Sequence, residues 1–209
     1  RPEDITAELT RLVAHGYKEA VLVGINLTAY GQDLGLSIAD AVDATCAVEG
    51  LERVRLGSLE PDFMTDEIIT RMKDQPKLCP QFHLALQSGC DATLKRMNRH
   101  YTTAEYADLC RRLREHFPDC ALTTDVMVGF PGETEEEFEE TLSLIQQVHY
   151  DSLFTFIFSP RKGTPAASME DPTPKQEKND RFDRLCALQN SISEEIHGEY
   201  VGKTFRCLV

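Results

Sequence analysis

The chain has 209 residues, enough for one large domain or two small ones. Its 41% hydrophobic and 27% charged residues form an ordinary globular composition, and no apolar run reaches the roughly 20 residues of a membrane helix. The formal net charge of −13 would repel a polyanion, so a general nucleic-acid binder is excluded unless a local basic patch makes the contact.

Seven cysteines are spread along the chain, at positions 46, 79, 90, 110, 120, 186 and 207. None of their spacings is a CxxC or CxxxC, so the sequence contains no local metal-binding motif. An odd number of cysteines without a visible signal peptide indicates reduced thiols and a cytoplasmic protein. The chain begins at Arg1 rather than at a methionine, and we expect it to be a piece of a longer protein.

Hydrophobic periodicity predicts alternating helices and strands. In chain order they are a helix through 5–13 that stops at Gly16, a strand over 20–25, a helix over 37–48, a strand over 53–58, a helix over 65–72, a strand over 82–87, a long loop, a helix over 103–117, a strand over 120–129, a helix over 134–148, a strand over 153–158, a Pro/Gly-rich loop over 159–174, a helix over 175–197 and a short strand over 204–209. Ser37 and Thr65 are predicted N-caps, and Thr134 with Glu137 forms a capping box.

The five main strands begin 29 to 39 residues apart, which is the period of a βα repeat. Because the strands are apolar on both faces, they favour a parallel sheet. The sequence therefore predicts an α/β fold, a partial parallel (β/α) barrel. Since a βα unit begins with a strand and this chain begins with a helix, we expect one further strand upstream.

Functional sites of parallel α/β folds lie at the carboxyl ends of the strands. The polar and glycine residues expected there are Gly24, Asn26, Glu60, Gln87, Ser88, Asp125, Gly129 and Arg161. Helix capping and turn chemistry explain Ser88 equally well, but they do not explain Glu60, Gln87 and Asp125 together. His83 is interpreted as an ordinary core histidine. The run of glutamates over 133–140 is interpreted as a solvated helix face, with another role open for Glu133 at the turn.

The sequence lacks the short motifs that mark several common enzyme classes. The sequence contains no Walker A loop, no GxGxxG, no HExxH and no GxSxG, so nothing supports a nucleotide-binding or hydrolytic enzyme of those kinds.

Three phrases occur in order at strand ends: LQSGCD with KRMNR over 86–99, GFPGET over 129–134 and SPRKGTPAA over 159–167. Together they resemble the radical S-adenosylmethionine (SAM) domain of the methylthiotransferase family, and the resemblance covers essentially the whole chain. Residues 200–209 resemble the opening of that family's TRAM domain, a small β-barrel that holds tRNA. The resemblance thus implies two parts, a radical SAM partial barrel over 1–199 and the start of a TRAM-like domain over 200–209.

The family's CxxxCxxC signature, which binds a [4Fe-4S] cluster, is absent from this sequence, and so are the three further cluster cysteines of the family's N-terminal domain. The resemblance implies a full-length enzyme with SAM and two [4Fe-4S] clusters. In that enzyme a radical derived from SAM would remove hydrogen from C2 of a tRNA adenine, and a sulfur atom and then a methyl group would be added at that position. We expect this chain alone to hold no cluster, to be inactive and to bind tRNA weakly, because tRNA would be held mainly through the TRAM domain.

The family's branches differ in substrate. Residues 55–61 (RLGSLEP) and 86–91 resemble the branch that acts on threonylcarbamoyladenosine, whereas residues 154–160 (FTFIFSP) resemble the isopentenyladenosine branch. We favour the first; a third branch, which modifies an aspartate of a ribosomal protein, matches less well at the second strand.

The resemblance also implies which residues bind SAM. Glu60, Gln87, Arg99 and Asp125 resemble in type and spacing a series that binds SAM in oxygen-independent coproporphyrinogen oxidases. Carboxylates suit the ammonium and the ribose diol of SAM, and a guanidinium suits its carboxylate. Arg99 could equally belong to a surface basic patch with Lys95. No catalytic residue and no metal ligand is assigned.

Two other classes of function stay open. One is a non-catalytic barrel kept for tRNA docking. The other is a phosphate-binding barrel enzyme, which would need a glycine-rich loop after its last strands. Gly163 and Thr164 match such a loop only weakly, because Pro165 lacks a donor N–H.

Overall fold

The computed structural model describes residues 1–208, and every strand pair in this part of the chain is parallel. The strands are β1 (Glu19–Leu22), β2 (Arg53–Leu56), β3 (Ser58–Leu59), β4 (Gln81–Leu84), β5 (Ala121–Val128) and β6 (Ser152–Ile157). The α-helices are α1 (Pro2–Ala14), α2 (Ile38–Cys46), α3 (Asp66–Lys73), α4 (Asp91–Arg96), α5 (Thr103–His116), α6 (Glu135–Val148) and α7 (Lys175–Gly198). Short 3-10 helices are η1 (Leu27–Ala29), η2 (Gln32–Leu34), η3 (Pro61–Phe63) and η4 (Pro165–Ser168). The predicted α/β class with parallel strands is confirmed.

The strands lie side by side in sequence order, as a two-stranded sheet β1-β2 and a four-stranded sheet β3-β4-β5-β6. The strand predicted over 53–58 is divided at Gly57, so the described residues form six strands rather than five. The Gly57 N–H donates to the Leu22 carbonyl at 2.8 Å, whereas Ser58 and Leu59 pair with β4. The chain thus changes its partner strand at Gly57, where a Cβ would lie 3.2 Å from the Leu22 oxygen.

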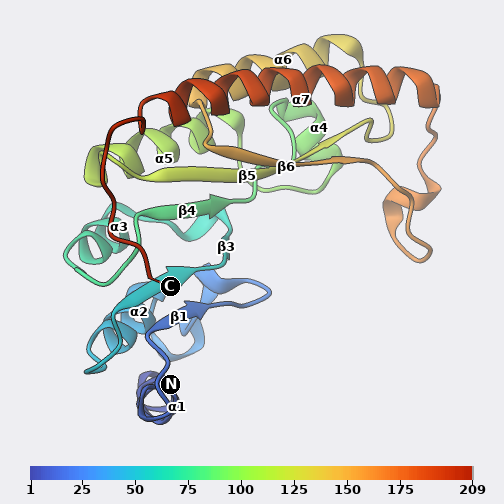
Figure 1. Ribbon diagram of the computed structural model, residues 1–209. Helices are drawn as coiled ribbons and strands as arrows, with labels where there is room; N and C mark the ends of the chain where they lie inside the picture. The colour runs from blue at the N-terminus through green and yellow to red at the C-terminus, as the bar shows by residue number, and fades with distance from the viewer. Residues whose placement is uncertain (209) are drawn as a thin grey trace.

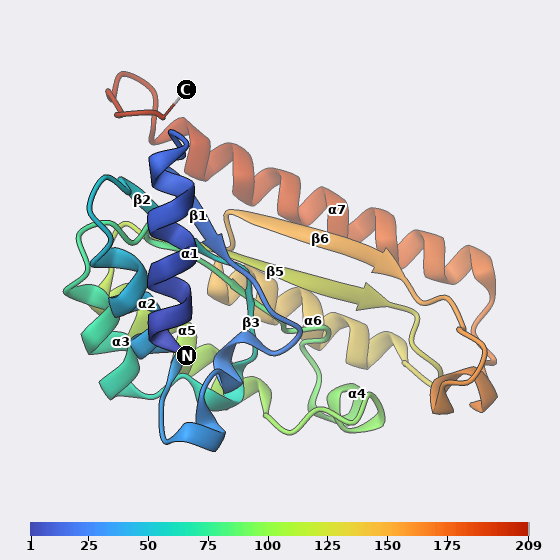
Figure 2. The ribbon, with the colours of Figure 1, turned by 90° about the horizontal axis from the view of Figure 1, so that it is seen from below.

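The helices cover one side of this curved row of strands and leave the other side open. Figures 1 and 2 show the row running from β1 beside α1 to β6 beside α7, with these two helices at opposite ends. Along β5 the side chains alternate strictly between buried and partly exposed. The buried set packs in the core with Phe82, Phe138 and Leu185, while Asp125 lies in the partly exposed set. The open face therefore keeps polar groups accessible above an apolar core.

Several helices begin at the predicted capping residues. Ser37 and Thr134 each form a capping box, and Thr65 accepts from the Ile68 N–H at 3.3 Å. The helix predicted over 103–117 begins at Thr103 as expected, with Thr102 as its N-cap. The long loop predicted between β4 and α5 contains a helix of its own, α4, which is too short to leave a periodic apolar pattern.

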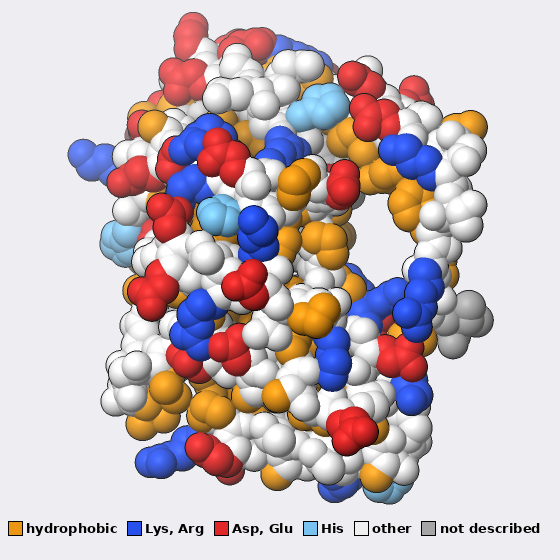
Figure 3. All heavy atoms as spheres, turned by 90° about the vertical axis from the view of Figure 1, so that its left-hand side faces the viewer, with side chains coloured by type: hydrophobic (Ala, Val, Ile, Leu, Met, Phe, Trp, Pro, Cys, Tyr) orange, Lys and Arg blue, Asp and Glu red, His pale blue; other side chains and the backbone are white. Residues whose placement is uncertain are grey.

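Residues 204–208, which follow α7, do not form a strand, so the prediction of a strand over 204–209 is wrong for these residues. Val209 lies outside the described residues. The segment runs back past the strands toward β2, and Arg206 Nη2 lies 3.0 Å from Glu52 Oε2. Figure 3 views the molecule from this side and shows basic and acidic side chains interspersed around an opening. None of the helices in residues 1–208 is long and apolar enough to cross a membrane.

Candidate functional site

A cavity of about 510 Å³ lies where β5 and β6 end. Three residues predicted for the site, Gln87, Asp125 and Arg161, contribute to its lining. The remaining lining residues are Met127, Phe156, Ile157, Phe158, Ser159, Thr164 and Ala166. The lining therefore combines polar and charged side chains with apolar and aromatic ones.

Gln87 extends β4 beyond its last regular residue with an unusual backbone conformation. Its φ is +70°, in the left-handed region that favours glycine, and such a residue costs about 1–3 kcal/mol. Its N–H donates to the Asp125 carbonyl at 2.8 Å, and its own carbonyl accepts from the Met127 N–H at 2.9 Å. The strand pairing thus compensates the strain and fixes Gln87 beside Asp125. Strained residues of this kind concentrate at functional sites.

Tyr101 stabilises the turn at Gln87 through the backbone that precedes it. Its buried hydroxyl lies 2.7 Å from the Ala85 carbonyl and 2.9 Å from the Leu86 carbonyl, the two residues that precede Gln87. A hydroxyl has one proton, so it donates to one of these oxygens at a time. Sequence reasoning missed Tyr101, because a tyrosine in a loop carries no signal of the distant backbone that it supports.

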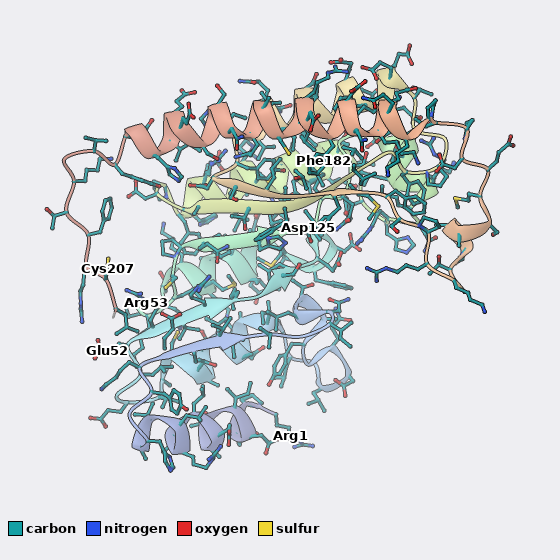
Figure 4. All side chains as sticks on the ribbon, turned by 45° about the vertical axis from the view of Figure 1, so that its right-hand side comes forward. Arg1, Glu52, Arg53, Asp125, Phe182 and Cys207 are labelled. Carbon is teal, nitrogen blue, oxygen red and sulfur yellow. The ribbon has the colours of Figure 1, made fainter. Side chains whose placement is uncertain are left out.

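Asp125 lies on the open face of β5, on the side turned away from α7 (Figure 4). Its side chain is 29% exposed, and its Oδ2 atom lies 3.4 Å from His83 Nε2 on β4. A carboxylate held at the edge of a partly closed face can still accept from a ligand.

Glu60 and Arg99 form an ion pair at the neighbouring strand. Glu60 directly follows β3, and Arg99 Nη1 lies 3.2 Å from its Oε2 and 3.4 Å from its Oε1. Both side chains are about 30% exposed, at 30% and 28%. Arg99 therefore folds back from the loop after α4, as the binding hypothesis requires. The four predicted residues thus form two pairs: Glu60 and Arg99 pair through their side chains, and Gln87 and Asp125 pair through their backbones. We call the edge of the sheet that carries these four residues the rim.

Four other predicted residues are engaged in local structure and do not contribute to the lining of the cavity. The Ser88 hydroxyl is buried against Thr141 of α6 at 3.4 Å. The Asn26 side chain accepts from the Ala29 N–H at 3.2 Å, as the N-cap of η1. Gly24 packs on that same turn, where a Cβ would lie 3.5 Å from the Leu27 Cα.

The fourth of these residues, Gly129, adopts a backbone conformation that favours glycine. Its φ is +69°, and a Cβ there would lie 2.6 Å from Lys178 Cδ on α7. Its N–H donates to Glu133 Oε2 at 2.6 Å, and burial raises the pKa of the Glu133 carboxyl. Arg181 of α7, which is 1% exposed, lies 3.2 Å from that carboxylate and donates to the Glu133 carbonyl at 2.9 Å. Glu133 thus fixes the turn after β5, and the partner Arg181 was not predicted.

Comparison with known protein families shows which superfamily the chain belongs to. Residues 1–145 match the model of the radical SAM superfamily. The chain belongs to the radical SAM superfamily. The superfamily's open barrel agrees with the parallel, sequence-ordered strands and the open face seen here.

Individual curated proteins also resemble the chain closely. It is 47% identical over 210 residues to the tRNA-2-methylthio-N(6)-dimethylallyladenosine synthase of Clostridium botulinum strain Hall, covering 100% of this chain and 47% of that protein. It is 44% identical over 211 residues to the enzyme of that name from Caldicellulosiruptor saccharolyticus, covering 100% of the chain and 45% of that protein. The chain spans about half the length of the curated relatives it matches.

Among solved structures, the fold resembles coproporphyrinogen III oxidase (HemN) from Escherichia coli, described as a radical SAM enzyme. The TM-score is 0.69 at 14% identity, and the match covers 91% of this chain and 46% of that one. This likeness concerns the fold alone.

The four residues predicted to bind SAM carry groups of the kinds that SAM can bind, although only Gln87 and Asp125 line the cavity. Glu60 and Asp125 offer carboxylates for an ammonium or a ribose diol, Arg99 offers a guanidinium for a carboxylate, and Gln87 offers an amide. Residues 1–208 contain no group of three or more histidine, cysteine, aspartate or glutamate side chains that could hold a metal ion.

Proposed function

We propose that this chain is the SAM-binding domain of a tRNA methylthiotransferase that modifies N6-dimethylallyladenosine, the isopentenyl type of adenosine. The observation that carries the proposal is the 47% identity over the whole chain to a synthase of that name. Because the chain spans about half of that relative, the complete activity belongs to the full-length protein.

The substrate branch differs from the one that the sequence favoured. Residues 55–61 and 86–91 favoured threonylcarbamoyladenosine, but the relatives carry the name of the dimethylallyl branch, which residues 154–160 resemble. Met127, Phe156 and Phe158 line the cavity and would suit an uncharged dimethylallyl group. Arg161 lines the same cavity and would suit a threonylcarbamoyl carboxylate, so the relatives support the dimethylallyl branch more strongly than the cavity does.

The residues of the rim would bind and orient SAM. When bound, SAM supplies the hydrogen-abstracting and methyl-donating chemistry, while the protein positions the groups and excludes water. Asp125 and Gln87 would hold one part of the cofactor, and the Glu60–Arg99 pair would hold another. Arg99 would pair with the cofactor's carboxylate, because a guanidinium matches that group in shape and charge.

The test uses the full-length protein with its iron–sulfur clusters reconstituted without oxygen. It is incubated with SAM, a reductant and tRNA that carries either dimethylallyladenosine or threonylcarbamoyladenosine, and the digested nucleosides are analysed by mass spectrometry. A methylthio group on dimethylallyladenosine alone is expected. Modification of threonylcarbamoyladenosine alone would restore the first interpretation. Modification of neither, with tRNA binding intact, would favour a docking barrel instead.

A further inference from the structure

Polar side chains form a continuous row across the open face of β4 and β5. Gln81 and His83 come from β4, and Thr123 and Asp125 come from β5, where His83 lies opposite Thr123 in the strand register. All four are partly buried. The row ends at Asp125, one of the residues assigned to SAM.

The contacts in this row favour one tautomer of His83. Gln81 Nε2 donates to Thr123 Oγ1 at 3.2 Å, and an amide nitrogen can only donate. The Thr123 hydroxyl lies 3.0 Å from His83 Nδ1 and, with no other acceptor among its hydrogen bonds in the described residues, can donate its own proton there. When Nδ1 of a neutral histidine accepts, Nε2 carries the proton. The row therefore favours the tautomer whose Nε2–H points toward Asp125 Oδ2, 3.4 Å away.

We propose that His83 is a positioning residue that holds the Asp125 carboxylate for SAM. In the structure the two groups are in contact at 3.4 Å without a hydrogen bond; when SAM binds, the Nε2–H of His83 donates to Oδ2 and leaves Oδ1 for the cofactor. This inference rests on the proposed function and extends it to a residue outside the set that the sequence assigned. The 3.4 Å separation is long for a hydrogen bond, and such contacts often shorten when the ligand binds.

His83 also makes a packing contact with an aromatic ring. The ring of Phe154 packs edge-on against His83, with centroids 5.6 Å apart and planes at 63°. Phe154 also lies opposite Asp125 in the register of β5 and β6. An ordinary packing histidine would need only this ring contact. The positioning role needs the Nε2 donor, so the two roles can be separated by substitution.

The experiment measures the SAM dissociation constant of the full-length, cluster-loaded protein by equilibrium dialysis with labelled SAM. His83→Leu removes the donor and is expected to weaken binding about tenfold, the usual effect of losing a hydrogen bond to a charged group. His83→Gln places an amide N–H near the former Nε2 position and is expected to stay within about threefold of the parent. Phe154→Leu, the matched control, removes the ring contact but keeps His83 Nε2 as a donor, and is expected to stay within about twofold.

A double-variant cycle tests whether His83 acts through Asp125. When Asp125→Asn is already present, His83→Leu is expected to weaken SAM binding by less than about twofold further. Thermal unfolding without SAM checks that each variant folds. Nitrogen-15 spectra of the histidine-labelled protein report the tautomer without any ligand: the signal lost in His83→Gln should show a protonated Nε2, and Thr123→Val should alter it.

The inference is overturned if His83→Leu binds SAM like the parent, or if His83→Gln is as weak as His83→Leu. It is also overturned if the effect of His83→Leu persists undiminished beside Asp125→Asn, or if the spectra show Nδ1 protonated in the parent. If the parent protein itself binds no SAM, the proposed function fails first and this inference fails with it.

Discussion

Arg181 on α7 lies 3.2 Å from the carboxylate of Glu133, the residue that closes the turn after β5. Both side chains are almost inaccessible, at 2% and 1%. The same carboxylate accepts from the Gly129 N–H, so this buried ion pair connects the C-terminal helix to the end of the strand that carries Asp125. The position of the rim therefore depends on α7, about 50 residues further along the chain.

Removing one partner of this pair should be costly. Arg181→Met leaves Glu133 buried without its cation, and we expect a loss of about 3–5 kcal/mol in the free energy of unfolding. The measurement is urea unfolding of the full-length protein at neutral pH. Arg184→Met is the matched control, because Arg184 pairs with Glu135 and Glu139 at 42% exposure and should cost at most about 1 kcal/mol. Equal losses in the two variants would contradict the role given to the buried pair.

The contact of α4 with α6 should depend on pH. Arg96 donates to Glu137, Nη1 lying 3.0 Å from Oε1, and this hydrogen bond holds the pKa of the Glu137 carboxyl below its usual value. A pKa lowered by folding gives stability that is present above the unfolded value near 4.5 and lost as the pH falls through the native value.

Glu137→Gln should therefore lower the free energy of unfolding by about 1–2 kcal/mol at pH 7 and by much less near pH 3. Paired urea titrations at several pH values measure the difference. Glu67→Gln, an exposed glutamate in the first turn of α3, serves as the control and should show no comparable trend. A difference that stays constant from pH 7 to pH 3 would show that the charge of Glu137 is not the cause.

The hydroxyl of Tyr101 should be needed for stability. Tyr101→Phe leaves the carbonyls of Ala85 and Leu86 without this donor inside the protein, at a cost of about 1–3 kcal/mol. Tyr30→Phe is the matched control, since the Tyr30 hydroxyl is buried without a protein partner among the described residues and should be lost at little cost. Thermal unfolding of both variants distinguishes them, and a Tyr101→Phe protein as stable as the control would refute the support role.

The order of helices and strands and their parallel arrangement could be predicted, because hydrophobic periodicity and capping residues are local signals. The partner change at Gly57 could not, since it depends on which neighbouring strand each carbonyl faces. The resemblance implied that Arg99 and Glu60 serve one site, but their ion pair was not predicted. The contacts of Tyr101, Arg181 and His83 join residues 15 to 48 positions apart, and no local sequence signal reports them.

The backbone conformation of Gln87 allows its two roles to be measured separately. A glycine at φ +70° is unstrained, whereas an alanine there keeps the strain. Gln87→Gly should therefore unfold with a free energy about 1 kcal/mol higher than Gln87→Ala. Both variants lose the side-chain amide, so both should weaken SAM binding by about 1–3 kcal/mol, and Asp125→Asn should have a similar effect. Urea unfolding gives the first difference, and equilibrium dialysis with the full-length protein gives the second. If Gln87→Ala binds SAM as tightly as the parent, the amide does not contact the cofactor, and the positive φ serves only to turn the chain after β4.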